Sequence, residues 1–144
     1  MDNKTSKGRV TGLGGIFIKY SNPDRIKEWY AEFLGINMDE YGTSFEWRNS
    51  ENPEQKGFTV WSVFSQASEY FTPSNKEMMI NFRVDDLDAI LAKLSKKGVY
   101  RLSPIEKTDY GRFAHIIDPE GMKIELWEAD DDAYDKMIGE NRTF

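Results

Sequence analysis

Glu125 and His115 are the residues of this sequence whose side chains could move a proton or hold a ligand from within apolar strands. They stand in the stretch FAHIIDPEGMKIELWE, residues 113–128, where Ile124 and Leu126 flank Glu125, and His115 is the single histidine of the chain. An ionisable group inside a strand is costly unless it is solvated, paired or bound to a metal. Each position therefore needs a chemical or a structural explanation.

Both residues have two interpretations that the sequence leaves open. Glu125 is either a ligand-contacting, catalytic carboxylate or a structural one, solvated at an edge or paired with Lys19. His115 is either an active-site side chain or a packed histidine with one hydrogen bond. Whether His115 lies on the same face as Glu125 depends on the turn between their strands, because a one-residue slip in register reverses the face.

Strand alternation adds polar candidates to the face that holds Glu125. In MMINFRV, residues 78–84, Met79, Asn81 and Arg83 share one face. The opposite faces of these strands are wholly apolar, as expected beneath helices, whereas the mixed faces are typical of a ligand cleft. The predicted ligand-binding residues are Lys19, Trp61, Asn81, Arg83 and Tyr110, the last as a polar side chain over the cleft.

Composition limits the classes of protein that the chain can represent. Its 144 residues suit one domain, and the net charge of −6 argues against nucleic acid as a partner. No apolar run approaches the roughly 20 residues that span a bilayer. The polar N-terminus shows no sign of secretion, so we expect a cytoplasmic protein. The absence of cysteine excludes disulfides, zinc–thiolate sites and cysteine nucleophiles.

Stepwise along the chain, the sequence predicts two rounds of one strand, one helix and three strands. The first round comprises a strand at 13–19, a helix at 22–35, a hairpin at 36–48 that turns at Tyr41-Gly42, and a strand at 58–64. The second round comprises a strand at 78–84, a helix at 85–98, and strands at VYRL (99–102), GRFAHII (111–117) and MKIELWE (122–128). The acidic tail, 129–144, could form a short helix.

The two rounds also correspond in number. An offset of 64 residues relates Gly15 to Met79, the candidate helix cap Asn22 to Asp86, and Gly57 to Gly121. The same offset relates Trp61 to Glu125. Such a repeat, present twice, predicts a single pseudo-symmetric domain with modules at about 11–64 and 78–128, a linker at 65–77 and a tail at 129–144.

At this level of detail the sequence resembles a known superfamily. Two βαβββ modules, WYAEFLG at the end of the first helix, and DPEGMKIELWE resemble the glyoxalase/bleomycin-resistance/dioxygenase (vicinal oxygen chelate) superfamily over about residues 11–128. MINFRVDDLDAIL and YGRFAHIIDPEG resemble an uncharacterised glyoxalase-like branch of it. The resemblance implies an α+β, pseudo-twofold glyoxalase-like fold, a cleft between the modules with a divalent metal ion, and a homodimer.

The same resemblance assigns the metal-ligand positions of the family to Gly15, Trp61, Met79 and Glu125. Gly15 has no side chain, Trp61 offers only an N–H donor, and Met79 is a soft thioether. A catalytic divalent ion commonly takes about three protein ligands. Because only Glu125 is a ligand type, we expect no metal and no other cofactor.

Three functions are compatible with these residues. The favoured one is a metal-independent domain that binds a small organic molecule, with aromatic residues on the strands: Phe17, Trp61, Phe64, Phe113 and Trp127. The second is a metal-free enzyme in which Glu125 or His115 acts as general base on a small carbonyl compound. The third is a metal-dependent lyase or isomerase resembling lactoylglutathione lyase, which requires ligands that the sequence lacks.

Overall fold

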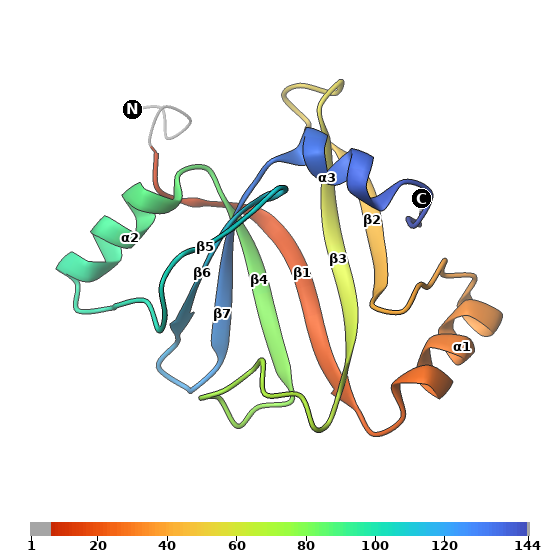
Figure 1. The fold of residues 1–144 in the computed structure, drawn as a ribbon. Coiled ribbons are helices and arrows are strands. Elements are labelled where there is room, and N and C mark those ends of the chain that lie inside the picture. The colour runs from red at the N-terminus through yellow and green to blue at the C-terminus, as the bar shows by residue number, and fades with distance from the viewer. Residues whose placement is uncertain (1–6, 144) are drawn as a thin grey trace.

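A curved mixed sheet forms the frame of the molecule (Figure 1). The computed structural model describes residues 7–143, in which seven strands follow the order β2-β3-β1-β4-β7-β6-β5. This architecture confirms the predicted α+β fold class. The strands are β1 (Val10–Tyr20), β2 (Gly42–Arg48), β3 (Lys56–Ser65), β4 (Met78–Val84), β5 (Glu106–Thr108), β6 (Gly111–Ile117) and β7 (Lys123–Ala129). The helices are α1 (Pro23–Leu34), α2 (Leu87–Lys96) and α3 (Asp131–Ile138).

The two central strands carry the predicted pseudo-symmetry. β1 and β4 are antiparallel, and each has a parallel neighbour, β3 beside β1 and β7 beside β4. Across the centre Gly15 pairs with Asn81, Ile16 with Ile80, and Phe17 with Met79. The offset of 64 residues exchanges the first and third pairs and leaves the middle pair unchanged, as a twofold axis at the middle pair requires.

The offset fails in the outer strands. Phe17 on β1 lies opposite Ser62 on β3, whereas its counterpart Asn81 on β4 lies opposite Glu125 on β7. The position equivalent to Glu125 is therefore held by Ser62. The prediction that Trp61 is equivalent to Glu125 is wrong by one residue, and one residue in a strand reverses the face.

Two of the predicted strand segments are irregular. Residues 36–41 form no strand of their own. The Asp39 carboxylate accepts hydrogen bonds from the backbone N–H groups of Tyr41 (2.7 Å) and Gly42 (2.8 Å) and folds the segment into a tight turn. Residues 99–102 likewise form no strand, and the short β5 pairs with β6 instead. The first module thus has two strands after its helix.

Helices α1 and α2 begin directly after their predicted N-cap residues, Asn22 and Asp86. The Asn22 side chain accepts a hydrogen bond from the N–H of Arg25 at 3.2 Å, and the Asp86 carboxylate accepts one from the N–H of Ala89 at 3.0 Å. Gly35 ends α1 in the left-handed conformation, with φ of 68°. α2 covers the convex face of the second module over a core of Val84, Leu87, Ala114, Ile116 and Leu126.

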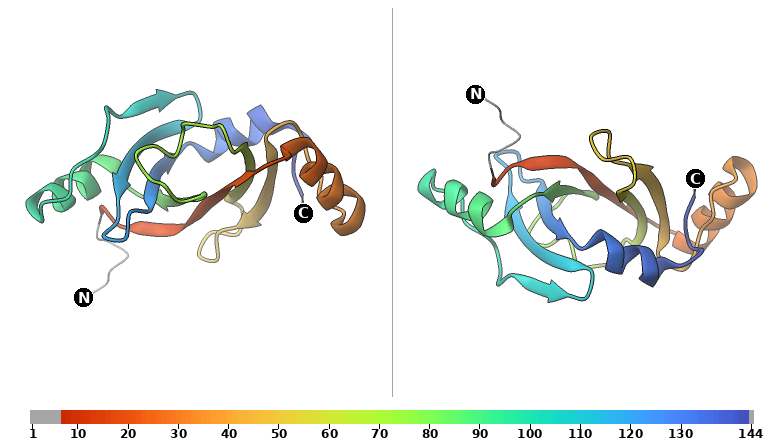
Figure 2. Two further views of the ribbon diagram at one scale, coloured as in Figure 1. Left: turned by 90° about the horizontal axis from the view of Figure 1, so that it is seen from below. Right: turned by 90° about the horizontal axis from the view of Figure 1, so that it is seen from above.

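Two segments lie on the other, concave side of the sheet (Figure 2). They are the connection 66–77 between β3 and β4, and α3 at the end of the chain. Tyr134 of α3 packs against Phe58 of β3 and Trp127 of β7, with ring centroids 5.1 and 5.2 Å apart. No helix within residues 7–143 is long and apolar enough to cross a membrane.

Candidate functional site

A cavity of about 390 Å³ opens on the concave face. Aromatic side chains line it from both halves of the sheet. Phe17, Phe64 and Tyr70 come from the first half and the connection after it, and Tyr110, Phe113, Trp127 and Tyr134 come from the second half and α3. Two pairs of these rings stack, Phe64 on Tyr70 at 5.8 Å and Phe113 on Trp127 at 5.6 Å. The walls are therefore largely apolar.

A single row of neighbouring residues crosses the floor beneath these walls. From β3 to β6 the row contains Val60, Gly15, Asn81, Glu125 and His115. His115 is directly opposite Glu125 in the antiparallel pair, so the two side chains share a face. The register thus answers the question that the sequence left open about these two residues.

Glu125 is the centre of a hydrogen-bonded cluster and is only 3% exposed. Its Oε1 accepts a hydrogen bond from the side-chain amide of Asn81 at 2.6 Å. Its Oε2 lies 2.7 Å from Nε2 of His115 and accepts a hydrogen bond from the Tyr70 hydroxyl. Both carboxylate oxygens are engaged, which satisfies a group that would be costly to bury alone.

Gly14 provides the room for this arrangement. A Cβ atom at residue 14 would lie 2.0 Å from Oδ1 of Asn81, so only glycine lets the amide reach Glu125 in this position. A Cβ at Gly15 would lie 2.9 Å from both the Phe17 ring and the Val60 carbonyl. The glycines of β1 therefore shape the floor of the cavity.

Tyr70 is a site residue that the sequence analysis missed. The residue is 38% exposed, yet its hydroxyl points to Glu125 and lies 3.3 Å from Nε2 of His115. Burial of the hydroxyl raises the pKa of Tyr70 well above its usual value, and the charge of Glu125 raises it further. The signal that could have found it is the aromatic pair Tyr70-Phe71 inside a polar linker.

The raised pKa of Tyr70 predicts a loss of stability in alkali. A tyrosine whose pKa is higher in the folded state stabilises the fold fully below its unfolded pKa of about 10, and this contribution is lost as the pH rises above that value. In Tyr70→Phe, the free energy of unfolding should therefore fall less between about pH 9 and pH 11 than in the parent. Urea unfolding at each pH measures this. The control is Tyr100→Phe, because the ring of Tyr100 is exposed, and its stability should depend on pH as that of the parent does. If the stability of Tyr70→Phe fell with pH as steeply as that of the parent and the control, the raised pKa of Tyr70 would be contradicted.

Three predicted ligand-binding residues lie away from the cavity lining. Trp61 is on the opposite face and packs edge-on against Tyr30 of α1, with centroids 4.3 Å apart. The ammonium of Lys19 lies over the Phe71 ring at 5.2 Å. Arg83 donates a hydrogen bond to Asp131 at 2.5 Å and fastens the start of α3.

Arg83 also has an aromatic environment of its own. Its guanidinium lies between the rings of Trp47 and Trp127, at 5.0 and 5.3 Å from their centroids. Cation–π contacts of this kind hold an arginine in place without a second carboxylate. Arg83 therefore supports the wall of the cavity from behind, through Trp127 and α3.

Of the other predicted residues, three line the cavity, whereas His115 is buried against Glu125 and lies outside the lining. The three are Asn81, Tyr110 and Glu125, and Ser62 occupies the place that had been expected for Trp61. Burial raises the pKa of Tyr110, and the charges of Glu106 and Glu125 add to the effect. The Tyr110 hydroxyl is therefore a neutral hydrogen-bonding group at the cavity wall.

The positions that the resemblance assigns to a metal do not fit a divalent ion. Met79 is fully buried in an apolar cluster with Phe17 and Phe71, and both oxygens of Glu125 already have partners. Within residues 7–143, no group of three or more His, Asp or Glu side chains is placed to hold an ion. The chemistry of this floor is that of a buried hydrogen-bond network.

Comparisons with known proteins agree with this architecture. The family model for the Glyoxalase/Bleomycin resistance protein/Dioxygenase superfamily matches residues 12–126. A methylmalonyl-CoA epimerase in complex with methylmalonyl-CoA and ammonium is 20% identical, with a TM-score of 0.61, over 85% of this chain and 96% of that one. The methylmalonyl-CoA epimerase from Mycobacterium tuberculosis is 24% identical, with a TM-score of 0.53, over 83% and 88%. No curated protein gives a significant sequence match. At these identities the structural likeness concerns the fold.

Proposed function

The chain belongs to the glyoxalase/bleomycin resistance protein/dioxygenase superfamily, and from this premise we propose that it binds a small organic molecule in the concave cavity without a divalent metal ion. The observation that carries the proposal is the cavity itself, with aromatic walls above a polar floor. Its volume of about 390 Å³ lies within the range of small-molecule sites. Its lining combines rigid apolar rings with a few polar groups, as such sites do.

The residues at the floor support a proposal without a metal ion. A divalent ion in this fold would need side chains at Gly15, Ser62 and Met79 that can supply charge or strong donors. Glycine, a serine hydroxyl and a buried thioether do not. Glu125 instead serves as the acceptor of three polar neighbours. These substitutions support recognition of an organic ligand through shape and hydrogen bonds.

A cavity-filling substitution tests the proposal. Ser62 lines the cavity, so Ser62→Phe should fill the floor and lower the affinity of any ligand by at least about tenfold. The matched control is Ser103→Phe, in an exposed loop outside the cavity. The measurement is a thermal-shift screen of small metabolites on protein treated with a chelator. Ligands that stabilise the parent and Ser103→Phe, but not Ser62→Phe, are the expected result; equal stabilisation of all three would place binding elsewhere.

A second function is favoured by one contact. Oε2 of Glu125 meets both the Tyr70 hydroxyl and the His115 ring, an arrangement in which a carboxylate can take a proton and share it with a neighbour. This geometry supports metal-free proton transfer on a small carbonyl compound. Glu125→Gln would remove such activity while the cavity keeps its shape.

The oligomeric state also belongs to the proposal. α1 exposes Trp29, Phe33 and Leu34, which are 46, 63 and 59% exposed. The homodimer implied by the resemblance stays a prediction, and a second copy would be expected to cover apolar surface of this kind.

A further inference from the structure

The charged side chains that line the cavity are both acidic. Glu125 lies at the floor, and Glu106 lies at the rim, where it is exposed. The chain carries 19 lysine and arginine residues, yet none within residues 7–143 lines the cavity. An anionic ligand would therefore meet two carboxylates and no compensating cation.

The nearest basic groups are committed to other partners. The ammonium of Lys123 donates a hydrogen bond to the Tyr70 carbonyl at 2.6 Å and lies 5.1 Å from the centre of the Tyr70 ring. Arg83 is paired with Asp131, and Lys19 lies over Phe71. None of these three cations lines the cavity, although the charges of Lys123 and Glu125 attract each other.

The walls present a surface suited to a planar group. Eight aromatic residues line the cavity, Tyr41 among them, and their ring faces carry partial negative charge. A flat cation held against such rings gains both apolar contact and cation–π attraction, which strengthens as water is excluded. Burial is the main cause of the raised pKa of Tyr110, and the nearby charges of Glu106 and Glu125 add to it.

We propose that the ligand of this cavity is a planar aromatic cation of about two or three fused rings, held between the aromatic walls with its charge directed toward Glu125 and Glu106. The inference rests on the proposed binding function and narrows it to one chemical class. Neutral aromatic molecules fit the shape but lose the electrostatic contribution. Aromatic carboxylates fit the shape and are repelled.

Three probes of closely similar shape separate these contributions. N-methylquinolinium is a cation, lepidine is neutral, and quinaldate is an anion at neutral pH. Titration calorimetry on chelator-treated protein at low ionic strength gives the affinity of each, since salt weakens the charge effect. The expected order is cation, neutral, anion, with the cation binding about tenfold more tightly than the neutral probe.

Substitution of each carboxylate tests whether Glu106 and Glu125 cause the preference for the cationic probe. Glu106→Gln should reduce the advantage of N-methylquinolinium over lepidine by about threefold, and Glu125→Gln should reduce it by more. Glu106 is exposed, so its variant keeps the fold even where Glu125→Gln is less stable. The control is Glu54→Gln, an exposed carboxylate in the loop before β3, which should keep the advantage of the parent.

The possible outcomes distinguish this inference from the proposed function. Equal affinity for all three probes, or tightest binding of quinaldate, would overturn the cationic class while leaving a cavity that binds organic molecules. Binding of none of the three would overturn the aromatic class as well. The proposed function itself would fail only with the Ser62→Phe screen.

Discussion

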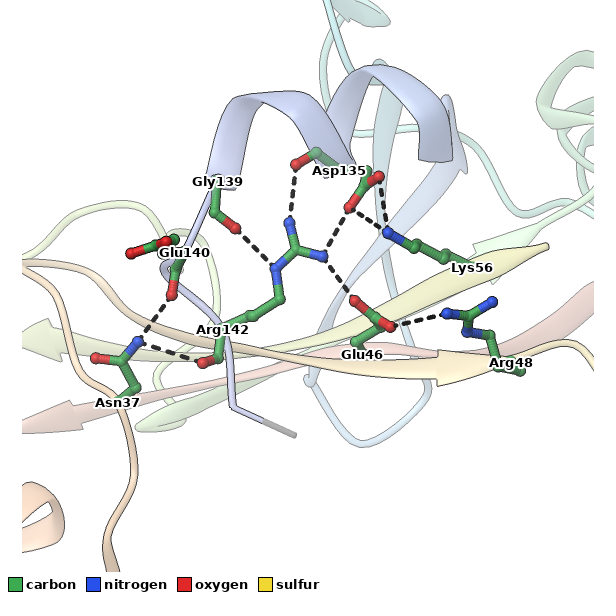
Figure 3. Close-up of polar contacts among 8 residues, drawn as sticks. All are labelled: Asn37, Glu46, Arg48, Lys56, Asp135, Gly139, Glu140 and Arg142. Atoms are coloured by element: carbon green, nitrogen blue, oxygen red, sulfur yellow. Dashed lines mark hydrogen bonds and ion pairs between the residues drawn. The ribbon is translucent and has the colours of Figure 1, made fainter. Parts of the chain in front are cut away.

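Replacing Arg142 by methionine should lower the free energy of unfolding by about 3 kcal/mol. The guanidinium joins α3 and the end of the chain to β2 (Figure 3). Its Nη1 donates to Glu46 at 2.6 Å and to Asp135 at 2.7 Å, and Nε donates to the Gly139 carbonyl at 2.8 Å. The side chains of Arg142 and Glu46 are only 8 and 10% exposed, so the substitution leaves a buried carboxylate without its main partner.

Arg48 supplies the matched control for this prediction. It contacts the same Glu46 carboxylate at 3.5 Å, but its side chain is 50% exposed. Exposed ion pairs contribute little, so Arg48→Met should cost less than about 1 kcal/mol. Urea unfolding of both variants gives the comparison. Equal losses of unfolding free energy would show that the buried position of Arg142 beneath α3 does not make its ion pairs more stabilising than that of Arg48.

The Arg142 variant should also affect the cavity. α3 contributes Tyr134 and Met137 to the lining, and the chain after it is held by Asn37, whose amide donates to the Glu140 carbonyl at 2.9 Å. A helix released at this end no longer presents those side chains in one position. We therefore expect weaker ligand binding in Arg142→Met and unchanged binding in Arg48→Met.

Glu125→Ala should cost about 4 kcal/mol, the largest loss expected within the cavity. The substitution removes the acceptor of Asn81, His115 and Tyr70 together, and Asn81 and His115 are 2 and 6% exposed. Polar groups left buried without partners carry the full cost of desolvation. Glu125→Gln keeps the volume and one acceptor oxygen, so its loss should be about half as large.

Glu120 is the control for the Glu125 variants. It lies exposed in the turn between β6 and β7, and Glu120→Ala should change stability by less than about 0.5 kcal/mol. A loss for Glu125→Ala as small as that of Glu120→Ala would contradict the hydrogen-bonded cluster. If the cavity also catalyses proton transfer, exchange of carbonyl-adjacent protons in heavy water should stop in Glu125→Gln and continue in Glu120→Gln.

The faces of the central strands could be predicted because alternation is a local property. The sequence alone placed Asn81, Arg83 and Glu125 on the mixed face, and the strand register agrees. The caps at Asn22 and Asp86 followed from the same local chemistry, in which a short polar side chain satisfies the first N–H groups of a helix.

The register between strands, the position of Tyr70 and the position of α3 could not be predicted. Each depends on contacts between residues far apart in the sequence, which local patterns do not encode. A one-residue difference in register between the two modules brings Ser62 to the cavity and turns Trp61 to α1. Tyr70 comes from a connection without periodicity, so nothing local showed that its hydroxyl reaches Glu125. The acidic tail folds as the expected short helix, yet its place across the concave face depends on ion pairs such as Arg83–Asp131.

The four tryptophans provide the most direct test of binding in the cavity, because only Trp127 lines it. Trp61 lies on the opposite face, Trp47 lies beside Arg83, and Trp29 is on α1. The measurement is the nitrogen–proton correlation spectrum of the indole groups, recorded on chelator-treated protein as a ligand from the screen or N-methylquinolinium is added. The Trp127 signal should move alone, and Ser62→Phe should abolish the change. Movement of the other three signals instead, or no movement of Trp127 at saturation, would contradict a ligand site in this cavity.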